Sequence, residues 1–143
     1  MNKLTMRFAN KKDINWLATN DHIQRKIIKR KIEQKEIIVT QLQNKLIGFI
    51  RIEFLWSMVP YMAMIKVKKE YQKQGVGKSL LQFIEKYLVK KGHKTLFTSS
   101  VANEKEPQKW HKYMGFKKCG YIDHIQKEGR EIFFYKNLRR ARD

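Results

Sequence analysis

The amino-acid sequence predicts an α/β fold of the mixed α+β kind, in which a mixed, mostly antiparallel sheet of about six to seven strands is flanked by about four helices. Two observations predict this class. Short runs with strand-like alternation are interleaved with segments in which apolar residues recur every three or four positions. One long helical segment also separates two apolar strands, which is the arrangement of a parallel βαβ unit at the centre of the sheet.

The N-terminal half is expected to begin with a short strand, followed by two helices and a group of antiparallel strands. Asp13 is a candidate N-cap for the first helix. The second helix is predicted from about Asp21 to Glu33, because Ile23, Ile27 and Ile28 form an apolar stripe. The expected strands in this half are residues 4–8, 36–42, 46–54 and 61–67, with turns at 43–45 and 55–60.

The C-terminal half is expected to alternate between helix and strand. A long amphipathic helix begins after Gly75, and Gly92 is placed to end it. A strand over residues 95–99 follows, and then a short helix from about Pro107 to Met114 that ends at Gly115. The last two strands are predicted over residues 116–122 and 131–138, joined through the polar turn 126–129.

Length and composition fit a single domain over residues 1–143. The chain has 143 residues, of which 42% are apolar and 12% aromatic, and one core can be built from these. The sequence shows neither a signal-type apolar run nor an apolar stretch long enough to cross a bilayer. Its lone Cys119 cannot form an intramolecular disulfide, and we interpret it as an ordinary strand residue. These observations predict a cytoplasmic protein with no membrane partner.

The chain is strongly basic. Lys and Arg number 32 against 13 Asp and Glu, which gives a formal net charge of +19. Such a charge attracts polyanions, and coenzyme A and nucleic acids both qualify. The basic residues are spread along the whole chain, so lysine faces that serve only solvation explain the excess equally well.

The most informative segment is Gln72-Lys73-Gln74-Gly75-Val76-Gly77-Lys78-Ser79, which lies directly between an apolar strand and an amphipathic helix. The start of a helix offers unpaired backbone N–H groups, and glycine lets a phosphate approach the backbone closely. This position predicts an anion site, although a glycine-bearing turn without a ligand is the alternative. The Walker A motif fails because position 72 is glutamine, and the dinucleotide motif fails because Leu80 replaces its third glycine.

Two motifs resemble those of the GNAT superfamily of N-acetyltransferases. The first is Gln72-x-x-Gly75-x-Gly77 between a strand and a helix, and the second is Asn103 followed by Trp110-His111-Lys112-Tyr113-Met114-Gly115-Phe116. With the order of elements, the resemblance covers essentially the whole chain. It implies a GNAT-like fold in which the fourth and fifth strands open around acetyl-CoA.

The resemblance also implies which residues hold acetyl-CoA as cosubstrate, with no metal. The backbone of Ile65 and Val67 pairs with the pantetheine arm, and Asn103 lies near the cofactor from the other side. The amides of the turn hold the pyrophosphate, and these belong to Gln72, Lys73, Gln74, Gly75, Val76, Gly77, Lys78 and Ser79. Lys73 and Lys78 either add charge there or are merely solvated.

Direct acyl transfer needs a base for the amine and an acid for the departing thiolate. In the family the acid is often a tyrosine, and His111 occupies that register here, so we expect His111 to be the acid or a cofactor contact. A histidine that makes only a local hydrogen bond is the alternative. The fourth strand lacks an acidic residue, so Glu53 on the neighbouring strand is the expected base. Its alternative is an outward-facing carboxylate or the partner of a lysine.

The predicted function is transfer of an acetyl group from acetyl-CoA to a primary amine by direct attack in a ternary complex. The expected acceptor is a small molecule or a peptide. Residues that could line its pocket are Trp16, Trp56 and Met58, with packing in the core or at its rim as the alternative. The resemblance adds Tyr121 and the stretch Glu131-Ile132-Phe133-Phe134-Tyr135, which lie where family members often shape the acceptor site. The alternatives are a catalytically weak or inactive acyl-CoA-binding regulator and a basic nucleic-acid-binding module. We rank nucleic acid last because no recognition motif accompanies the charge. The expected assembly is a monomer or a homodimer.

Overall fold

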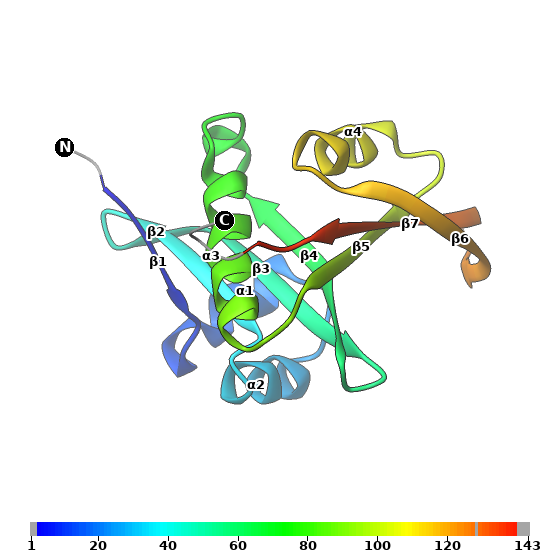
Figure 1. Ribbon diagram of the computed structural model, residues 1–143. Helices are drawn as coiled ribbons and strands as arrows, with labels where there is room; N and C mark the ends of the chain where they lie inside the picture. Colours follow the sequence, from blue (N-terminus) through cyan, green and yellow to red (C-terminus); the bar gives the residue numbers. More distant parts are fainter. Residues whose placement is uncertain (1–2, 128, 140–143) are drawn as a thin grey trace. The chain divides into compact units, whose positions relative to one another are not determined.

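The computed structural model describes residues 3–127 and 129–139. Within them seven strands form one sheet with the order β1-β2-β3-β4-β5-β7-β6. Pairing is parallel between β4 and β5, and antiparallel for β1–β2, β2–β3, β5–β7 and β6–β7. The predicted mixed, mostly antiparallel sheet with a parallel βαβ unit is thereby confirmed (Figure 1). The elements are β1 (Leu4–Phe8), η1 (Lys11–Asp13), α1 (Ile14–Asn20), α2 (Arg25–Glu33), β2 (Ile37–Leu42), β3 (Lys45–Leu55), β4 (Val59–Val67), η2 (Lys69–Tyr71), α3 (Val76–Lys90), β5 (Thr95–Val101), α4 (Lys105–Tyr113), β6 (Lys117–Gln126) and β7 (Gly129–Asn137).

The chain divides into two compact units. The first consists of Met1–Ile52 with Met64–Ile84, and the second of Glu53–Ala63 with Glu85–Asp143. The strands β3 and β4 and the helix α3 contribute residues to both units. The two units are therefore described one at a time.

The first unit is built on the meander of β1, β2 and β3, against which α1 and α2 pack. Leu17 of α1, Ile28 of α2, Val39 of β2 and Phe49 of β3 are buried in one cluster. The ring of Trp16 meets that of Phe49 edge to face, with centroids 5.9 Å apart. Trp16 therefore packs on this core, which is the common position for a large aromatic side chain.

A close approach of two strands explains one glycine in the first unit. A Cβ added to Gly48 of β3 would lie 2.9 Å from the backbone oxygen of Lys66 on β4 and 3.2 Å from the methyl group of Thr40 on β2. The Lys66 oxygen belongs to the backbone and cannot move without shifting β4. Gly48 thus holds the part of β4 that leads into the predicted anion-binding turn against β3.

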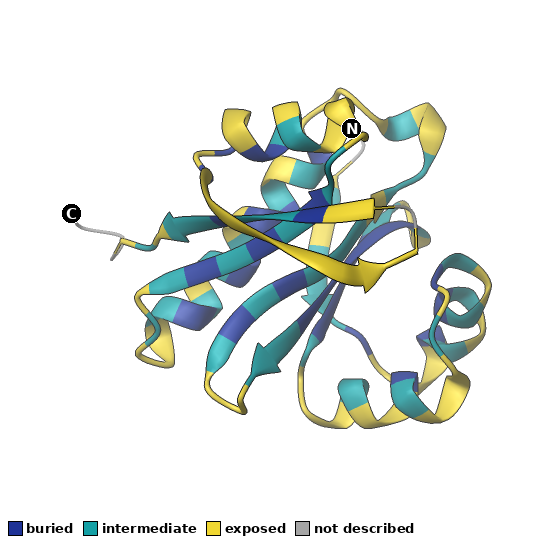
Figure 2. Ribbon diagram, turned by 90° about the vertical axis from the view of Figure 1, so that its right-hand side faces the viewer, coloured by how far each residue is buried: buried dark blue, intermediate teal, exposed yellow. Residues whose placement is uncertain are grey.

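The second unit consists mainly of β5, β7 and β6, which run side by side with α4 above them in Figure 1. On β5 the burial alternates strictly, with Leu96, Thr98 and Ser100 buried and the residues between them half-buried. The edge strand β6 is exposed along its whole length (Figure 2). The two faces of β5 therefore differ, and the half-buried face is the more accessible one.

The helix ends agree with the predicted glycines. Gly92 has φ +93°, and the His93 amide donates to the carbonyl oxygen of Leu88 at 2.9 Å. Gly115 has φ +97°, and the Phe116 amide donates to the carbonyl oxygen of His111 at 3.0 Å. Both are left-handed C-terminal caps, for which glycine has no Cβ penalty.

The first helix begins where it was expected, at Ile14 directly after Asp13, but the Asp13 side chain caps none of its amides. Asn10, not Asp13, caps the first helical segment, because its side chain accepts from the Lys12 amide at 2.9 Å. Asp13 instead accepts from the Asn10 amide at 2.8 Å and from the guanidinium of Arg7 at 2.7 and 3.0 Å. The predicted start of the second helix is wrong, because this helix begins four residues later than expected, at Arg25.

Asp21, the predicted start of that second helix, forms a buried ion pair instead. Its carboxylate accepts from the guanidinium of Arg51 at 2.7 and 3.3 Å, and both side chains are fully buried. At the other end of the chain, α4 begins at Lys105 and places Pro107 in its first turn, where the missing amide is harmless. Glu128 of the predicted last turn lies outside the described residues.

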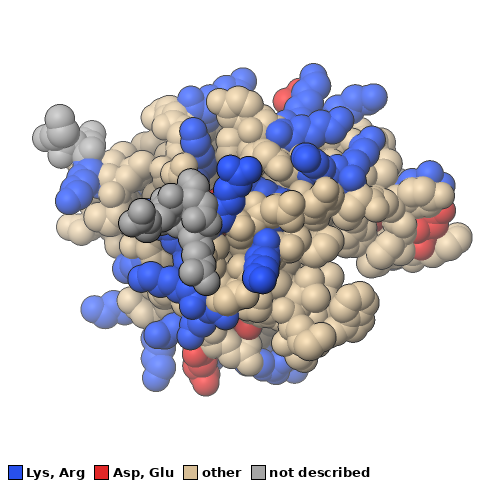
Figure 3. All heavy atoms as spheres, in the orientation of Figure 1, with Lys and Arg blue, Asp and Glu red and all other residues tan. Residues whose placement is uncertain are grey.

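The basic residues are widely distributed over the visible face, where Lys and Arg far outnumber the acidic residues (Figure 3). This distribution agrees with the sequence, in which no single basic block occurs. None of the helices in the described residues has the length and hydrophobicity needed to cross a bilayer. Cys119 is an exposed residue of β6.

Candidate active site

The segment between β4 and α3 forms an open turn whose conformation requires glycine. Gly75 has φ +86°, a left-handed value that other residues rarely adopt, and a Cβ added there would meet nothing within 4 Å. Residues Gln72 to Gly75 are exposed. The space in front of Gly75 is thus empty of protein atoms, as an approaching phosphate requires.

The start of α3 presents its amides at this turn. The Ser79 amide donates to the carbonyl oxygen of Gly75 at 3.0 Å. The amides of Val76, Gly77 and Lys78 belong to the first turn of the helix, where backbone N–H groups have no partner within the helix. Together with the positive end of the helix dipole, these amides are suited to binding an anion.

Glutamine side chains hold the turn in shape. Gln72 Nε2 donates to the carbonyl oxygen of Val67 at 2.9 Å, and Gln74 Nε2 donates to that of Glu70 at 3.1 Å. The first of these bonds ties the start of the turn to the end of β4. Ile65 and Val67, the two residues expected to pair with a pantetheine arm, are half-buried on this last part of β4.

His111 lies on α4 in the second unit, and its side chain is buried among aromatic rings. Its ring centroid is 5.3 Å from that of Phe134, 5.9 Å from that of Phe116 and 5.9 Å from that of Trp110. Nδ1 is buried without a hydrogen-bond partner in the described residues. Burial disfavours the charged imidazolium and lowers the pKa of His111 to about 4. At neutral pH the ring is therefore uncharged.

The other predicted residues of the second unit, Glu53 and Asn103, lie on two different segments. Glu53 is half-buried near the end of β3, and Asn103 is exposed in the turn between β5 and α4. This turn is held by Gln108, whose Nε2 donates to the carbonyl oxygens of Val101, Ala102 and Glu104 at 2.8 to 3.2 Å. Tyr113 is 78% exposed, as expected for a residue on the opposite side of the helix from His111.

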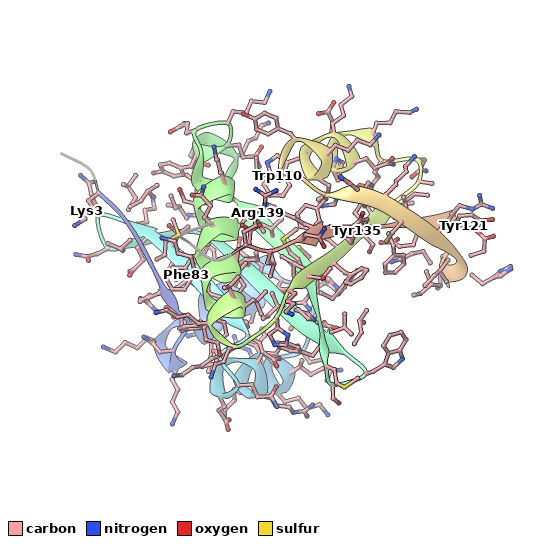
Figure 4. All side chains as sticks on the ribbon, viewed as in Figure 1. Lys3, Phe83, Trp110, Tyr121, Tyr135 and Arg139 are labelled. Atoms are coloured by element: carbon pink, nitrogen blue, oxygen red, sulfur yellow. The ribbon has the colours of Figure 1, made fainter. Side chains whose placement is uncertain are left out.

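The residues considered for an acceptor pocket differ widely in exposure. Trp56 and Met58 protrude from the turn between β3 and β4 and are 82% and 67% exposed. Tyr121 lies toward the outer end of β6 (Figure 4), where the guanidinium of Arg130 stacks on its ring at 3.7 Å. Trp16 packs in the first unit's core.

A polar chain that the sequence did not reveal runs across three strands of the second unit. Tyr61 Oη on β4 lies 2.5 Å from Ser99 Oγ on β5, and Ser99 Oγ donates to Glu131 Oε2 on β7 at 2.6 Å. Glu131 is only 7% exposed, and its Oε1 has no hydrogen-bond partner in the described residues. Sequence spacing could not indicate this group, because its members are far apart in the chain and meet only through strand pairing.

Comparison with known proteins identifies the family. A family model described as the acetyltransferase (GNAT) family matches residues 6–116, which include β1 to α4 and the open turn. The chain belongs to the GNAT family. The resemblance inferred from the two sequence motifs is thereby confirmed.

Solved GNAT-family folds agree with the architecture. The structure of Ard1 from Thermoplasma volcanium superposes with a TM-score of 0.83 at 14% identity, over 95% of this chain and 98% of that one. The PaiA N-acetyltransferase from Thermoplasma acidophilum, solved in complex with coenzyme A, gives 0.76 at 16% identity, over 95% and 99% of the two chains. At these identities the likeness concerns the fold.

One curated relative is more similar in sequence but longer. The S-alkylcysteine N-acetyltransferase of Bacillus subtilis (strain 168) is 32% identical over 84 residues, which are 54% of this chain and 46% of that protein. The GNAT chain described here thus matches about half the length of this relative.

Proposed function

We propose that this GNAT-family chain transfers the acetyl group of acetyl-CoA to a primary amine by direct attack in a ternary complex. The observation that carries the proposal is the open turn at Gly75, which lies at the start of a long helix and within the part of the chain that matches the family. Relatives are described as N-acetyltransferases, and one was solved with coenzyme A bound.

The turn has the chemistry that a pyrophosphate needs. The first-turn amides of α3 can donate to phosphate oxygens, and the left-handed Gly75 leaves the approach to them unobstructed. Lys73 and Lys78 are exposed beside these amides and can add positive charge. Acetyl-CoA would supply an acetyl thioester, and the backbone of Ile65 and Val67 would align its pantetheine arm. Asn103 is a further proposed cofactor contact.

For proton transfer we propose His111 and Glu53. Because His111 is neutral above pH 4, its role is that of an uncharged hydrogen-bond donor to the thioester or the leaving sulfur. Glu53 can accept a proton from the amine directly or through water. His111→Gln and Glu53→Gln each remove the proposed group while keeping most of the side-chain volume.

The test is calorimetric titration of acetyl-CoA into the purified protein and into two variants of Gly75. Gly75→Ala adds a Cβ at positive φ, which costs about 1–2 kcal/mol of backbone strain but adds no charge. Gly75→Glu adds the same strain together with a carboxylate in the proposed phosphate site. We expect 1:1 binding to the wild type, weakened binding to Gly75→Ala and none to Gly75→Glu. A folded wild type that binds no acetyl-CoA would refute the proposal.

A coenzyme A-binding regulator without turnover is the second candidate. The observation that favours it is the burial of His111 among aromatic rings, where its packing role alone would explain the residue. This candidate predicts saturable acetyl-CoA binding but no acetylated product with any primary amine. Mass spectrometry of reactions with amine mixtures separates the two candidates.

A further inference from the structure

Glu131 differs from the other buried acidic residues of the chain. Within the described residues, the buried acidic side chains are Asp13, Asp21 and Glu131. Each of the two aspartates faces an arginine at 2.7 Å. Glu131 accepts from one hydroxyl group instead, and its other oxygen is buried with no partner in the described residues. A buried carboxylate without a counter-charge is costly, so a functional reason for it is needed.

The hydroxyl groups form a directed path to this carboxylate. Because Glu131 Oε2 can only accept, the proton of Ser99 points toward Glu131 at 2.6 Å. The oxygen of Ser99 must then accept from Tyr61, whose Oη lies 2.5 Å away. Both hydroxyl groups therefore donate in the same direction, from Tyr61 to Ser99 and from Ser99 to Glu131. Such a chain can pass a proton toward its buried end by shifting each hydrogen along one bond.

The path lies on the more accessible face of the sheet. Ser99 stands opposite Phe133 and Tyr61 is in register with Phe97, and paired residues share a face. The rings of Tyr61 and Phe133 have centroids 6.1 Å apart, and those of Phe97 and Tyr135 6.5 Å apart. Tyr135 is labelled on β7 in Figure 4. This face thus combines aromatic rings with a buried carboxylate, the two features that attract an ammonium group with an apolar substituent.

We propose that Glu131 is the terminal proton acceptor for the acceptor amine, reached through Tyr61 and Ser99, and that the acceptor is a primary amine with an apolar substituent. This inference rests on the proposed acetyl transfer. The ammonium gives one proton to Tyr61 Oη, Tyr61 gives its own to Ser99, and Ser99 gives its own to Glu131. The neutral nitrogen then bonds to the acetyl carbon, the carbon–sulfur bond breaks, and the thiolate takes the second proton from the nitrogen. Glu131 finally releases its proton to solvent.

One structural feature of Glu131 suits it to this role. Taking up a proton removes the only charge of Glu131, which no cation in the described residues compensates. The reaction thereby relieves a cost already present in the free protein. Glu53→Gln serves as the competing variant, because loss of turnover there with normal turnover in Glu131→Gln would reverse the assignment.

The experiment measures acetylation of benzylamine by the full chain, with kcat and KM for both substrates and calorimetric Kd values. Glu131→Gln is expected to lower kcat by about 100-fold or more, the usual contribution of a general base, with the acetyl-CoA Kd changed less than about twofold. Ser99→Ala and Tyr61→Phe are expected to lower kcat similarly, and Glu131→Asp to restore part of the loss. The matched control is Glu106→Gln, a carboxylate of α4 that is 90% exposed and should keep wild-type kinetics.

The outcomes separate this inference from the proposed function. Benzylamine binding is measured without cofactor as well, and it should be at least about fivefold weaker in Glu131→Gln than in the wild type, because the carboxylate is removed. If acetyl-CoA does not bind but benzylamine binding depends on Glu131, acetyl transfer fails while the amine site stands. If acetyl-CoA binds and Glu131→Gln keeps wild-type kcat, the proton path is wrong and the proposed function stands. A wild type that neither binds nor acetylates benzylamine overturns the inference.

Discussion

Replacement of His111 should remove a large part of the acid sensitivity of folding. The side chain is 5% exposed, and burial lowers its pKa from 6.5 to about 4. An unfolded chain therefore takes up a proton at His111 at a higher pH than the folded chain does. The stability linked to this residue is fully present above pH 6.5 and is lost as the pH falls toward 4. His111→Phe keeps a ring among Phe116, Phe134 and Trp110 but has no group that titrates.

The magnitude follows from the two pKa values. With about 6.5 in the unfolded state and about 4 in the folded state, His111 costs the fold about 2 kcal/mol on going from pH 7.5 to pH 5 and about 2.6 kcal/mol by pH 4.5. The limiting loss, reached below pH 4, is about 3.4 kcal/mol. The total acid sensitivity also includes the carboxylates, which are common to both proteins. The difference between wild type and variant isolates the histidine.

Urea unfolding at pH 7.5, 6.5, 5.5 and 5.0 measures this difference. Whatever the absolute effect of His111→Phe at pH 7.5, the variant should lose about 2 kcal/mol less than the wild type between pH 7.5 and 5.0. His124→Asn, which removes an exposed imidazole of β6, is the matched control and should follow the wild type. Parallel curves for wild type and His111→Phe would refute the buried, neutral histidine.

Three further predictions concern stability in urea. Gly48→Ala places a Cβ 2.9 Å from the Lys66 carbonyl oxygen and should lower the free energy of unfolding by about 1–3 kcal/mol. An unchanged urea midpoint would contradict the close strand approach. Arg51→Met leaves the Asp21 carboxylate buried without its guanidinium partner and should lower the free energy of unfolding by about 3–5 kcal/mol. A loss below about 1 kcal/mol would contradict this prediction. Glu131→Gln replaces an uncompensated carboxylate by an amide and should leave the free energy of unfolding unchanged or raise it by up to about 1 kcal/mol. A loss of more than about 2 kcal/mol would indicate that the carboxylate has a structural role.

The fold could be predicted largely from local patterns. The apolar periodicity of α3, the glycine caps at Gly92 and Gly115, and the strand runs all depend on neighbours in sequence, and the structure has them where they were expected. The start of the second helix was misplaced because it depends on a distant partner. Asp21 was expected to begin this helix, but Arg51 of β3 binds its carboxylate.

The candidate site likewise has one part that local sequence could indicate and another that it could not. The turn from Gln72 to Ser79 is a contiguous segment with a glycine at positive φ, so its spacing was enough to indicate an anion site. The packing of His111 could not be foreseen, because the rings around it come from β7 and from both sides of it in sequence. Nothing in the spacing of Tyr61, Ser99 and Glu131 marks them as neighbours.

The buried acidic residues show that the effect of a charge in this chain depends on the groups beside it. A net charge of +19 suggests an abundance of cations for every carboxylate, and Asp13 and Asp21 do face arginines. Within the described residues Glu131 is buried without one, although basic residues are numerous at the surface. Placing a lysine beside it would stabilise the fold but would also repel an ammonium group. The lack of a neighbouring cation is therefore the feature that leaves this carboxylate able to attract an amine.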